Sequence, residues 1–260
     1  MPEPDAELLE RAVREAGAIA KAIYEKPHRT WSKTDGSPVT EADLAVDRHL
    51  GERLRAARPG YGWLSEESED DPARLGARRV FVVDPIDGTL AFVKRRPHFA
   101  VSAAVVEGES PVAACVFNPL TDECFTAAQG EGARLNGAPI RVTARAALEG
   151  CRMLASRNTL GSPRWMPWPP MVTDVPNSIA YRVALVAGGV FDAAITMAAT
   201  HDWDLAAADL IVREAGGIIT SVEGVPPRYN RADIVQPSVL AAGPALHAEI
   251  LSRLDRKQPR

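Results

Sequence analysis

The hydrophobic pattern of the chain changes its period, and this change limits what the chain can fold into. Over residues 5–25 apolar side chains recur every three to four positions, which predicts an amphipathic helix. A polar loop over residues 26–38 separates it from a second helix, which opens at Thr40 with Asp43 as its capping-box partner and stops at Pro59-Gly60. Beyond this point the apolar residues gather in short runs, as they do in buried strands. Two helices therefore precede a sheet.

The short apolar runs in the middle of the chain predict a set of strands. Asn136-Gly137, between two short strand-like segments, is a strong signal for a two-residue hairpin turn. The expected strands cover residues 80–83, 99–106, 111–117 and 123–127.

The pattern starts again after about residue 145. A strand over 152–155 precedes a long proline-rich loop, residues 157–177, and then a helix that opens at Asn177 or Ser178 and ends at Gly188-Gly189. The chain is thus of the α/β class, in the mixed α+β sense, and we expect two lobes, residues 1–145 and 146–260. The remaining elements are strands near 191–197, over 218–222 and over 238–242, and helices over 203–214 and from Pro244.

Composition argues against several classes of function. The 260 residues include 30 basic and 34 acidic side chains, a net charge of −4, which argues against binding of a nucleic-acid polymer. No apolar run is long enough to span a bilayer, and the acidic first residues lack the features of a signal peptide. The three cysteines form no CxxC pair and fit a reducing compartment, so we expect a cytoplasmic protein with no membrane partner.

Acidic residues directly follow one of these apolar runs. Val80–Val83 delivers Asp84 to the carboxyl end of a strand, and Asp87 follows three residues later. Two carboxylates at such a turn are hard oxygen donors that suit Mg²⁺. The backbone N–H groups of Gly88 and Thr89, where a helix can open, suit a phosphate. A plain helix cap explains the isolated motif equally well.

Other acidic segments have simple structural explanations when each is taken alone. Ser65-Glu66-Glu67-Ser68 continues into more acidic residues, as a solvated loop does. His201-Asp202-Trp203-Asp204 opens a helix, and capping fits Asp202 better than Asp204. Asp43 needs no role beyond its capping box. A functional site is indicated only by the segments together.

Together, these segments resemble the inositol monophosphatase family of Mg²⁺-dependent, lithium-sensitive phosphatases, which includes the CysQ-like 3'(2'),5'-bisphosphate nucleotidases. The resemblance spans residues 33–217, and Asp-Pro-Ile-Asp-Gly-Thr is its most specific motif. It implies the layered αβαβα fold of the sugar phosphatases, with two sheets, and frequent homodimers. The matching segments are Lys33–Asp43, Ser65–Ser68, Asp84–Thr89 and Trp203–Gly217.

The resemblance also implies roles for individual residues. Two or three Mg²⁺ ions are expected, and Thr89 and Glu66 would orient the attacking water. The implied metal ligands are Glu66, Asp84, the carbonyl of Ile86, Asp87 and Asp204, with Asp43 at a loosely held third metal. The implied catalytic residues are Glu66, Thr89 and Asp43, and the implied substrate-binding residues are Asp87, Gly88, Thr89 and Asp204.

This set of residues is chemically coherent. Its side-chain ligands are five carboxylates, and without cations several of them would take up protons, because close neighbours cannot all ionise cheaply. Two or three Mg²⁺ ions remove the conflict. The expected activity is hydrolysis of a small phosphate monoester by metal-activated water.

Other enzyme classes fit the sequence less well. A haloacid-dehalogenase-type phosphatase needs an aspartate two residues before Asp87, where Pro85 stands. The chain has neither the G-x-S-x-G of serine hydrolases nor a P-loop. A non-catalytic regulator that binds metal and phosphate stays open as an alternative.

The substrate is less well defined than the chemistry. An inositol-1-phosphate-type phosphatase is the simplest expectation; the alternatives are a phosphatase of 3'-phosphoadenosine 5'-phosphate and one of histidinol phosphate. Inositol-cleaving relatives carry a glutamate seven residues before the aspartate of Trp-Asp, where this chain has Met197. A thioether cannot replace a carboxylate as an acceptor for ring hydroxyls. Trp165, Trp168 and Tyr181 either pack the proline-rich loop against the body of the protein, which we favour, or stack on a base or form a lid.

Overall fold

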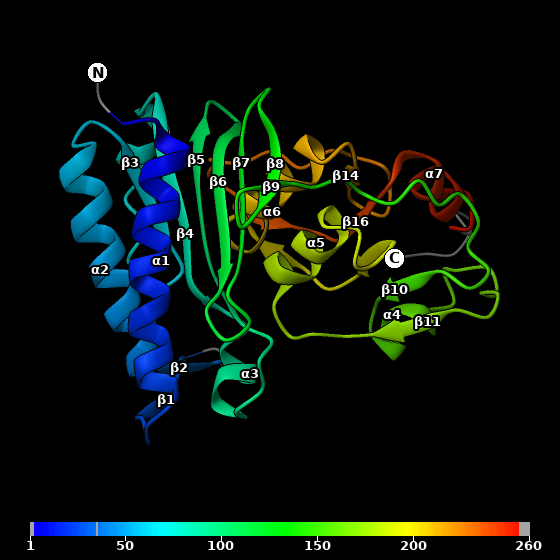
Figure 1. Ribbon diagram of the computed structural model, residues 1–260, viewed down its shortest axis with the longest axis horizontal. Coiled ribbons are helices and arrows are strands. Elements are labelled where there is room, and N and C mark those ends of the chain that lie inside the picture. Colours follow the sequence, from blue (N-terminus) through cyan, green and yellow to red (C-terminus); the bar gives the residue numbers. More distant parts are fainter. Residues whose placement is uncertain (1–2, 35, 255–260) are drawn as a thin grey trace.

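The computed structural model, which describes residues 3–34 and 36–254, is built in alternating layers of helix and sheet (Figure 1). Helices α1 (Asp5–Tyr24) and α2 (Glu41–Ala57) cover one face of a seven-stranded sheet. Helices α5 (Ile179–Ala187) and α6 (Asp202–Glu214) lie between this sheet and a second, five-stranded one. Helix α7 (Pro244–Ser252) packs on the far side of the second sheet. The expected αβαβα layering is confirmed.

The first sheet is almost entirely antiparallel. In the first sheet β3 is parallel to β4, and all other neighbours are antiparallel. In spatial order it contains β3 (Gly62–Ser65), β4 (Arg79–Asp87), β5 (Ala100–Glu107), β6 (Ser110–Asn118), β7 (Glu123–Ala128), β8 (Gly132–Leu135) and β9 (Ala138–Pro139). The second contains β11 (Val172–Asp174), β10 (Arg152–Leu154), β12 (Ala193–Thr196), β16 (Val239–Ala242) and β14 (Ile218–Thr220).

The layering explains why the strands are continuously apolar. Successive side chains of a strand point to opposite faces, so a sheet covered on both faces needs apolar residues at every position. In β4, Phe81 and Val83 belong to the core beneath α1 and α2, whereas Val80 and Val82 belong to the core around α5 and α6. A third core lies between the second sheet and α7.

Most predicted elements are confirmed. Each helix longer than five residues lies within a few residues of its predicted position, and Thr40 and Asp43 form the expected capping box at the start of α2. The hairpin turn is present between β8 and β9, with Asn136 and Gly137 at φ of 49° and 80°. Local turn chemistry was sufficient to predict both features.

Two predicted loops were wrong in part. The loop over 26–38 contains β1 (Thr30–Ser32), which pairs with β2 (Pro38–Thr40). The proline-rich loop contains the short helix α4 (Arg157–Leu160) and the edge strand β11. All residues of β1 and β11 are exposed, so neither strand shows the alternation by which a half-buried strand is recognised.

Strand β4 also continues further than predicted. Its partner residues on β5 shift between Asp84, which pairs with Ser102, and Asp87, which pairs with Ala100. Two residues of β4 therefore lie opposite one residue of β5, a bulge that redirects the side chains at the end of the strand. The acidic motif lies in this bulge, immediately before the short helix α3 (Thr89–Val93).

We propose the division into lobes near residue 145, in the segment that joins the two sheets. The first sheet ends at Pro139 and the second begins at Arg152. Helix α6, from the second half, nevertheless packs on the first sheet, so the lobes share one core. Among the described helices, none has the length and apolar character needed to cross a membrane.

Candidate active site

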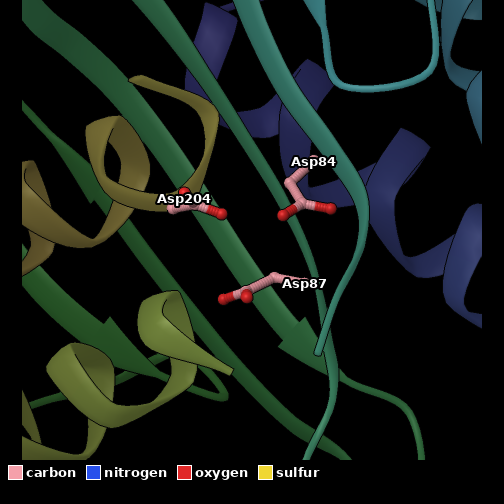
Figure 2. Close-up of side chains that lie close together, drawn as sticks. All are labelled: Asp84, Asp87 and Asp204. Atoms are coloured by element: carbon pink, nitrogen blue, oxygen red, sulfur yellow. The ribbon is translucent and has the colours of Figure 1, made fainter. Parts of the chain in front are cut away.

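Three carboxylates from distant parts of the chain converge at the end of β4 (Figure 2). Asp84 and Asp87 come from the bulge of β4, and Asp204 comes from the first turn of α6. Each offers one oxygen, and these oxygens lie within 4.8 Å of one another. Oxygens at this spacing are arranged as ligands of a hard cation such as Mg²⁺.

Asp84 is held by its own turn. It is buried, and its Oδ1 accepts a hydrogen bond of 3.0 Å from the backbone N–H of Ile86. Gly88, which follows the turn, has φ of +97°, a conformation that favours glycine. The chain can therefore leave β4 sharply and begin α3 at Thr89.

Asp87 has a second structural partner, the first turn of α5. Its Oδ2 accepts hydrogen bonds of 2.6 Å from the Ser178 hydroxyl and from the backbone N–H of Ala180. Its Oδ1 accepts a bond of 3.2 Å from the N–H of Ile179. A carboxylate is stabilised at a helix N-terminus, so Asp87 both enters the acidic group and stabilises α5.

Asp204, and not Asp202, caps α6, so the prediction from the sequence was wrong here. The Oδ2 of Asp204 accepts a bond of 2.6 Å from the backbone N–H of His201, whose ring stacks on Trp203 with centroids 4.8 Å apart. Asp202 is buried and turned toward the loop that leads into β15 (Val235–Gln236), which pairs with β13 (Thr200–His201). There it accepts bonds from Asn230 N–H and the Gln236 side chain.

Asp43 and Thr89 are hydrogen-bonded to each other. The Thr89 hydroxyl lies 3.0 Å from Asp43 Oδ1 and 3.0 Å from the carbonyl oxygen of Ile86. Asp43 Oδ2 accepts bonds from the N–H and hydroxyl of Thr40. The capping box of α2 is thus compatible with a site role for Asp43, because only one of its oxygens serves the cap.

Glu66 lies beside the three converging carboxylates and bonds to a cation. Its Oε1 lies 2.7 Å from the ammonium of Lys33, which is also 2.8 Å from Glu67 Oε1. Lys33 opens the first matching segment, but nothing in the sequence showed which acid it contacts. Its pairing with Glu66 required the fold.

The raised pKa values of Asp84 and Asp87 show that ionising both carboxylates is costly without a cation. Burial, followed by the charges of Glu66 and Asp87, raises the pKa of Asp84 well above its ordinary value. Burial and the charge of Asp204 raise the pKa of Asp87 to about 7, although its hydrogen bonds from α5 lower it. A divalent cation compensates the buried negative charge of these neighbours, so the donor set fits Mg²⁺.

We expect the metal-free protein to lose stability as the pH rises. Between 3.8, the ordinary pKa of an aspartate, and about 7, folded Asp87 holds a proton that the unfolded chain has released, so its contribution to the free energy of unfolding falls. If the site holds Mg²⁺, the ion should bind the charged, folded form and raise the melting temperature at the upper end of this window. Melting curves recorded in EDTA and in Mg²⁺ measure the stabilisation by the metal. Titrating groups away from the site contribute to both curves, so the difference between the curves reports the site. No Mg²⁺ effect at the upper end of the window would contradict the metal site.

Trp165 and Trp168 of the proline-rich loop pack in the protein, as favoured from the sequence, whereas Tyr181 lies in α5 and contacts the first sheet. Trp165 and Trp168 have ring centroids 5.1 Å apart, and the indole N–H of Trp165 lies 3.2 Å from the sulfur of Met197. Met197 packs against the core of the second sheet. The hydroxyl of Tyr181 donates to Glu123. These contacts assign structural roles to all three rings.

Comparison with known proteins agrees with this geometry. The chain matches the model of the inositol monophosphatase family over residues 1–258. An inositol-1-monophosphatase of Rhizobium meliloti is 40% identical over 197 residues, 72% of this chain and 73% of the relative. A 3'(2'),5'-bisphosphate nucleotidase CysQ of Aggregatibacter actinomycetemcomitans is 31% identical over 245 residues, 86% of this chain and 87% of the relative.

A solved structure shows the same fold over nearly the whole chain. The extragenic suppressor protein suhB from Bartonella henselae superposes with a TM-score of 0.85 at 29% identity, covering 97% of this chain and 98% of that one. The family match, the curated relatives and the shared fold lead to one conclusion. This chain belongs to the inositol monophosphatase family and is a phosphoric monoester hydrolase.

Proposed function

We propose that the chain is a Mg²⁺-dependent phosphatase that hydrolyses inositol 1-phosphate or a closely related monoester. The observation that carries this proposal is the convergence of Asp84, Asp87 and Asp204 from two distant elements. In this proposal two or three Mg²⁺ ions bind. Their ligands are Glu66, Asp84, the carbonyl of Ile86, Asp87 and Asp204, with Asp43 at the third ion.

The proposed ligands fit this ion because they are carboxylate and carbonyl oxygens. Bound Mg²⁺ supplies positive charge for the phosphate oxygens and makes a coordinated water more acidic. Glu66 bonds to Lys33 through Oε1, so its second oxygen, Oε2, is the atom that it offers to a metal. The contact with Lys33 is therefore compatible with metal binding.

Thr89 orients the water in this proposal. Its hydroxyl has one proton, which Asp43 or the Ile86 carbonyl accepts at 3.0 Å. The lone pairs of Oγ1 can accept a hydrogen bond from water, which turns a water lone pair toward phosphorus. Glu66 takes part in orienting the same water. The N–H groups of Gly88 and Thr89 donate to the phosphate oxygens.

The similar proteins favour one substrate class and leave a second candidate. The 40% identical relative is named an inositol-1-monophosphatase, which favours inositol 1-phosphate. The CysQ relative supports 3'-phosphoadenosine 5'-phosphate as the second candidate. Met197, engaged with Trp165, provides no carboxylate for ring hydroxyls, so in this proposal the side-chain contacts to the substrate come from Asp87 and Asp204.

A comparison of rates tests the substrate. We expect kcat/KM for inositol 1-phosphate to exceed the values for 3'-phosphoadenosine 5'-phosphate, histidinol phosphate and fructose 1,6-bisphosphate by about tenfold, which hydroxyl contacts can supply. EDTA should stop all turnover. Fastest cleavage of the adenosine compound or of histidinol phosphate would replace the substrate assignment. Mg²⁺ binding without turnover of any ester would make the protein a regulator.

Three further properties form part of this proposal. Lithium should inhibit at Mg²⁺ concentrations that support activity, and indifference to lithium would count against the assigned branch of the family. We propose a homodimer, which the resemblance to the family supports. We also propose a cytoplasmic location, which free Cys115, Cys124 and Cys151 support.

A further inference from the structure

Asp47, which the proposed chemistry does not use, holds the turn that carries Glu66. Its Oδ1 accepts a hydrogen bond of 2.5 Å from the Ser65 hydroxyl, and its Oδ2 accepts one of 2.9 Å from the Ser68 hydroxyl. The two serines flank Glu66 and Glu67 on either side. One carboxylate therefore closes the turn at both ends.

The helix that carries Asp47 is well placed to act as a support. Asp47 follows Asp43 by four positions, so both lie on one face of α2. The capping box anchors the start of this helix, and its apolar face packs under the first sheet. Asp47 thus ties the Glu66 turn to the same rigid element that presents Asp43.

The other bonds of the turn leave Glu66 less well defined. Its backbone N–H donates to the Val83 carbonyl at 3.3 Å, which continues the pairing of β3 with β4. Its side chain bonds to the ammonium of Lys33, which lies at the end of a flexible stem. The two hydrogen bonds that Asp47 accepts hold both ends of the turn, and bonds to an ionised acceptor are stronger than those between neutral groups.

We propose that Asp47 is a positioning residue that fixes Glu66 for the metal by holding Ser65 and Ser68. This inference rests on the proposed metal site. Asp47 lies outside the group of three converging carboxylates, and both of its oxygens bond to serine hydroxyls, so it acts as a support and not as a ligand. Its effect is on the geometry of Glu66 and hence on metal affinity, because groups that orient metal ligands contribute to affinity almost as the ligands do.

The test measures Mg²⁺ binding to the metal-stripped protein by titration calorimetry, without substrate. Asp47→Ala is expected to raise the dissociation constant for Mg²⁺ about tenfold, the lower end of the loss seen when such groups are removed. Asp47→Asn should stay within about threefold of wild type, because its amide oxygen and NH₂ can each bond to one serine hydroxyl. Glu52→Ala, which removes an exposed carboxylate from the same helix, should change nothing.

A double-mutant cycle separates positioning from loss of charge. Ser65→Ala with Ser68→Ala keeps the Asp47 charge and should weaken Mg²⁺ binding, and adding Asp47→Ala to this pair should weaken it no further. Additive effects, or equal weakening by Asp47→Asn and Asp47→Ala, would overturn the positioning role. If Asp47→Ala does not fold, the serine pair carries the test, and unchanged binding in it overturns the proposal.

The proposed function and this inference fail in different ways. If wild type binds no Mg²⁺, the metal site itself is wrong. If wild type binds Mg²⁺ and all Asp47 and serine variants bind it equally, only the positioning role is wrong. As a second readout, kcat at saturating Mg²⁺ should stay near the wild-type value in Asp47→Ala, because excess metal restores the position of Glu66.

Discussion

Replacing Asp84 with asparagine is expected to lower kcat by about a thousandfold, the size of loss that follows removal of one group from a preorganised electrostatic site. The same change should leave the fold intact and make the metal-free protein more stable above neutral pH. Asparagine Oδ1 can still accept the bond from Ile86 N–H, and a neutral amide removes a buried charge that neighbouring acids repel. Activity and stability should therefore move in opposite directions.

Steady-state rates in Mg²⁺ and melting temperatures in EDTA measure these two effects. Asp87→Asn is the informative comparison, because its carboxylate also accepts three bonds from the start of α5. That variant should lose activity and also melt at a lower temperature. Retention of kcat within tenfold in Asp84→Asn would remove Asp84 from the proposed metal site.

Replacing Gly88 with alanine is expected to reduce kcat by about a hundredfold and to cost about 1–3 kcal/mol of stability, as strained backbone positions do. At φ of +97°, a side chain is already strained. The added Cβ would also lie 2.9 Å from the His98 carbonyl oxygen and 3.1 Å from the Ser178 nitrogen. The Ser178 N–H donates a hydrogen bond of 3.3 Å to the His98 carbonyl oxygen, and this bond connects the site to the start of α5.

Gly216→Ala is the matched control for this prediction. Gly216 has φ of +84°, yet nothing lies within 4 Å of an added Cβ. It should lose about 1 kcal/mol from backbone strain alone and keep its full activity. Equal stability losses in the two variants, with normal rates in Gly88→Ala, would show that the close approach of His98 and Ser178 has no part in the site.

Much of the candidate site could be predicted before the fold was known. The apolar run before Asp84 predicted a buried strand that ends in acids, and the resemblance to the family implied that Asp204 joins them. The structure brings Asp84, Asp87 and Asp204 together. The sequence did not predict that Glu66 bonds to Lys33 or that Asp47 holds the serines beside it. A signal for Asp47 existed, because it lies one helical turn after Asp43, but its partners belong to a different element.

The sequence by itself determined the features that depend on near neighbours in the chain. The period of apolar residues, the Thr40 capping box and the Asn136-Gly137 turn all follow from interactions within a few residues. Only the tertiary structure decided that exposed β11 pairs with β10, that Asp87 stabilises α5, and that Asp202 bonds to Gln236. Such polar contacts and edge strands leave no periodic trace, because each joins distant segments that the packing of the whole chain brings together.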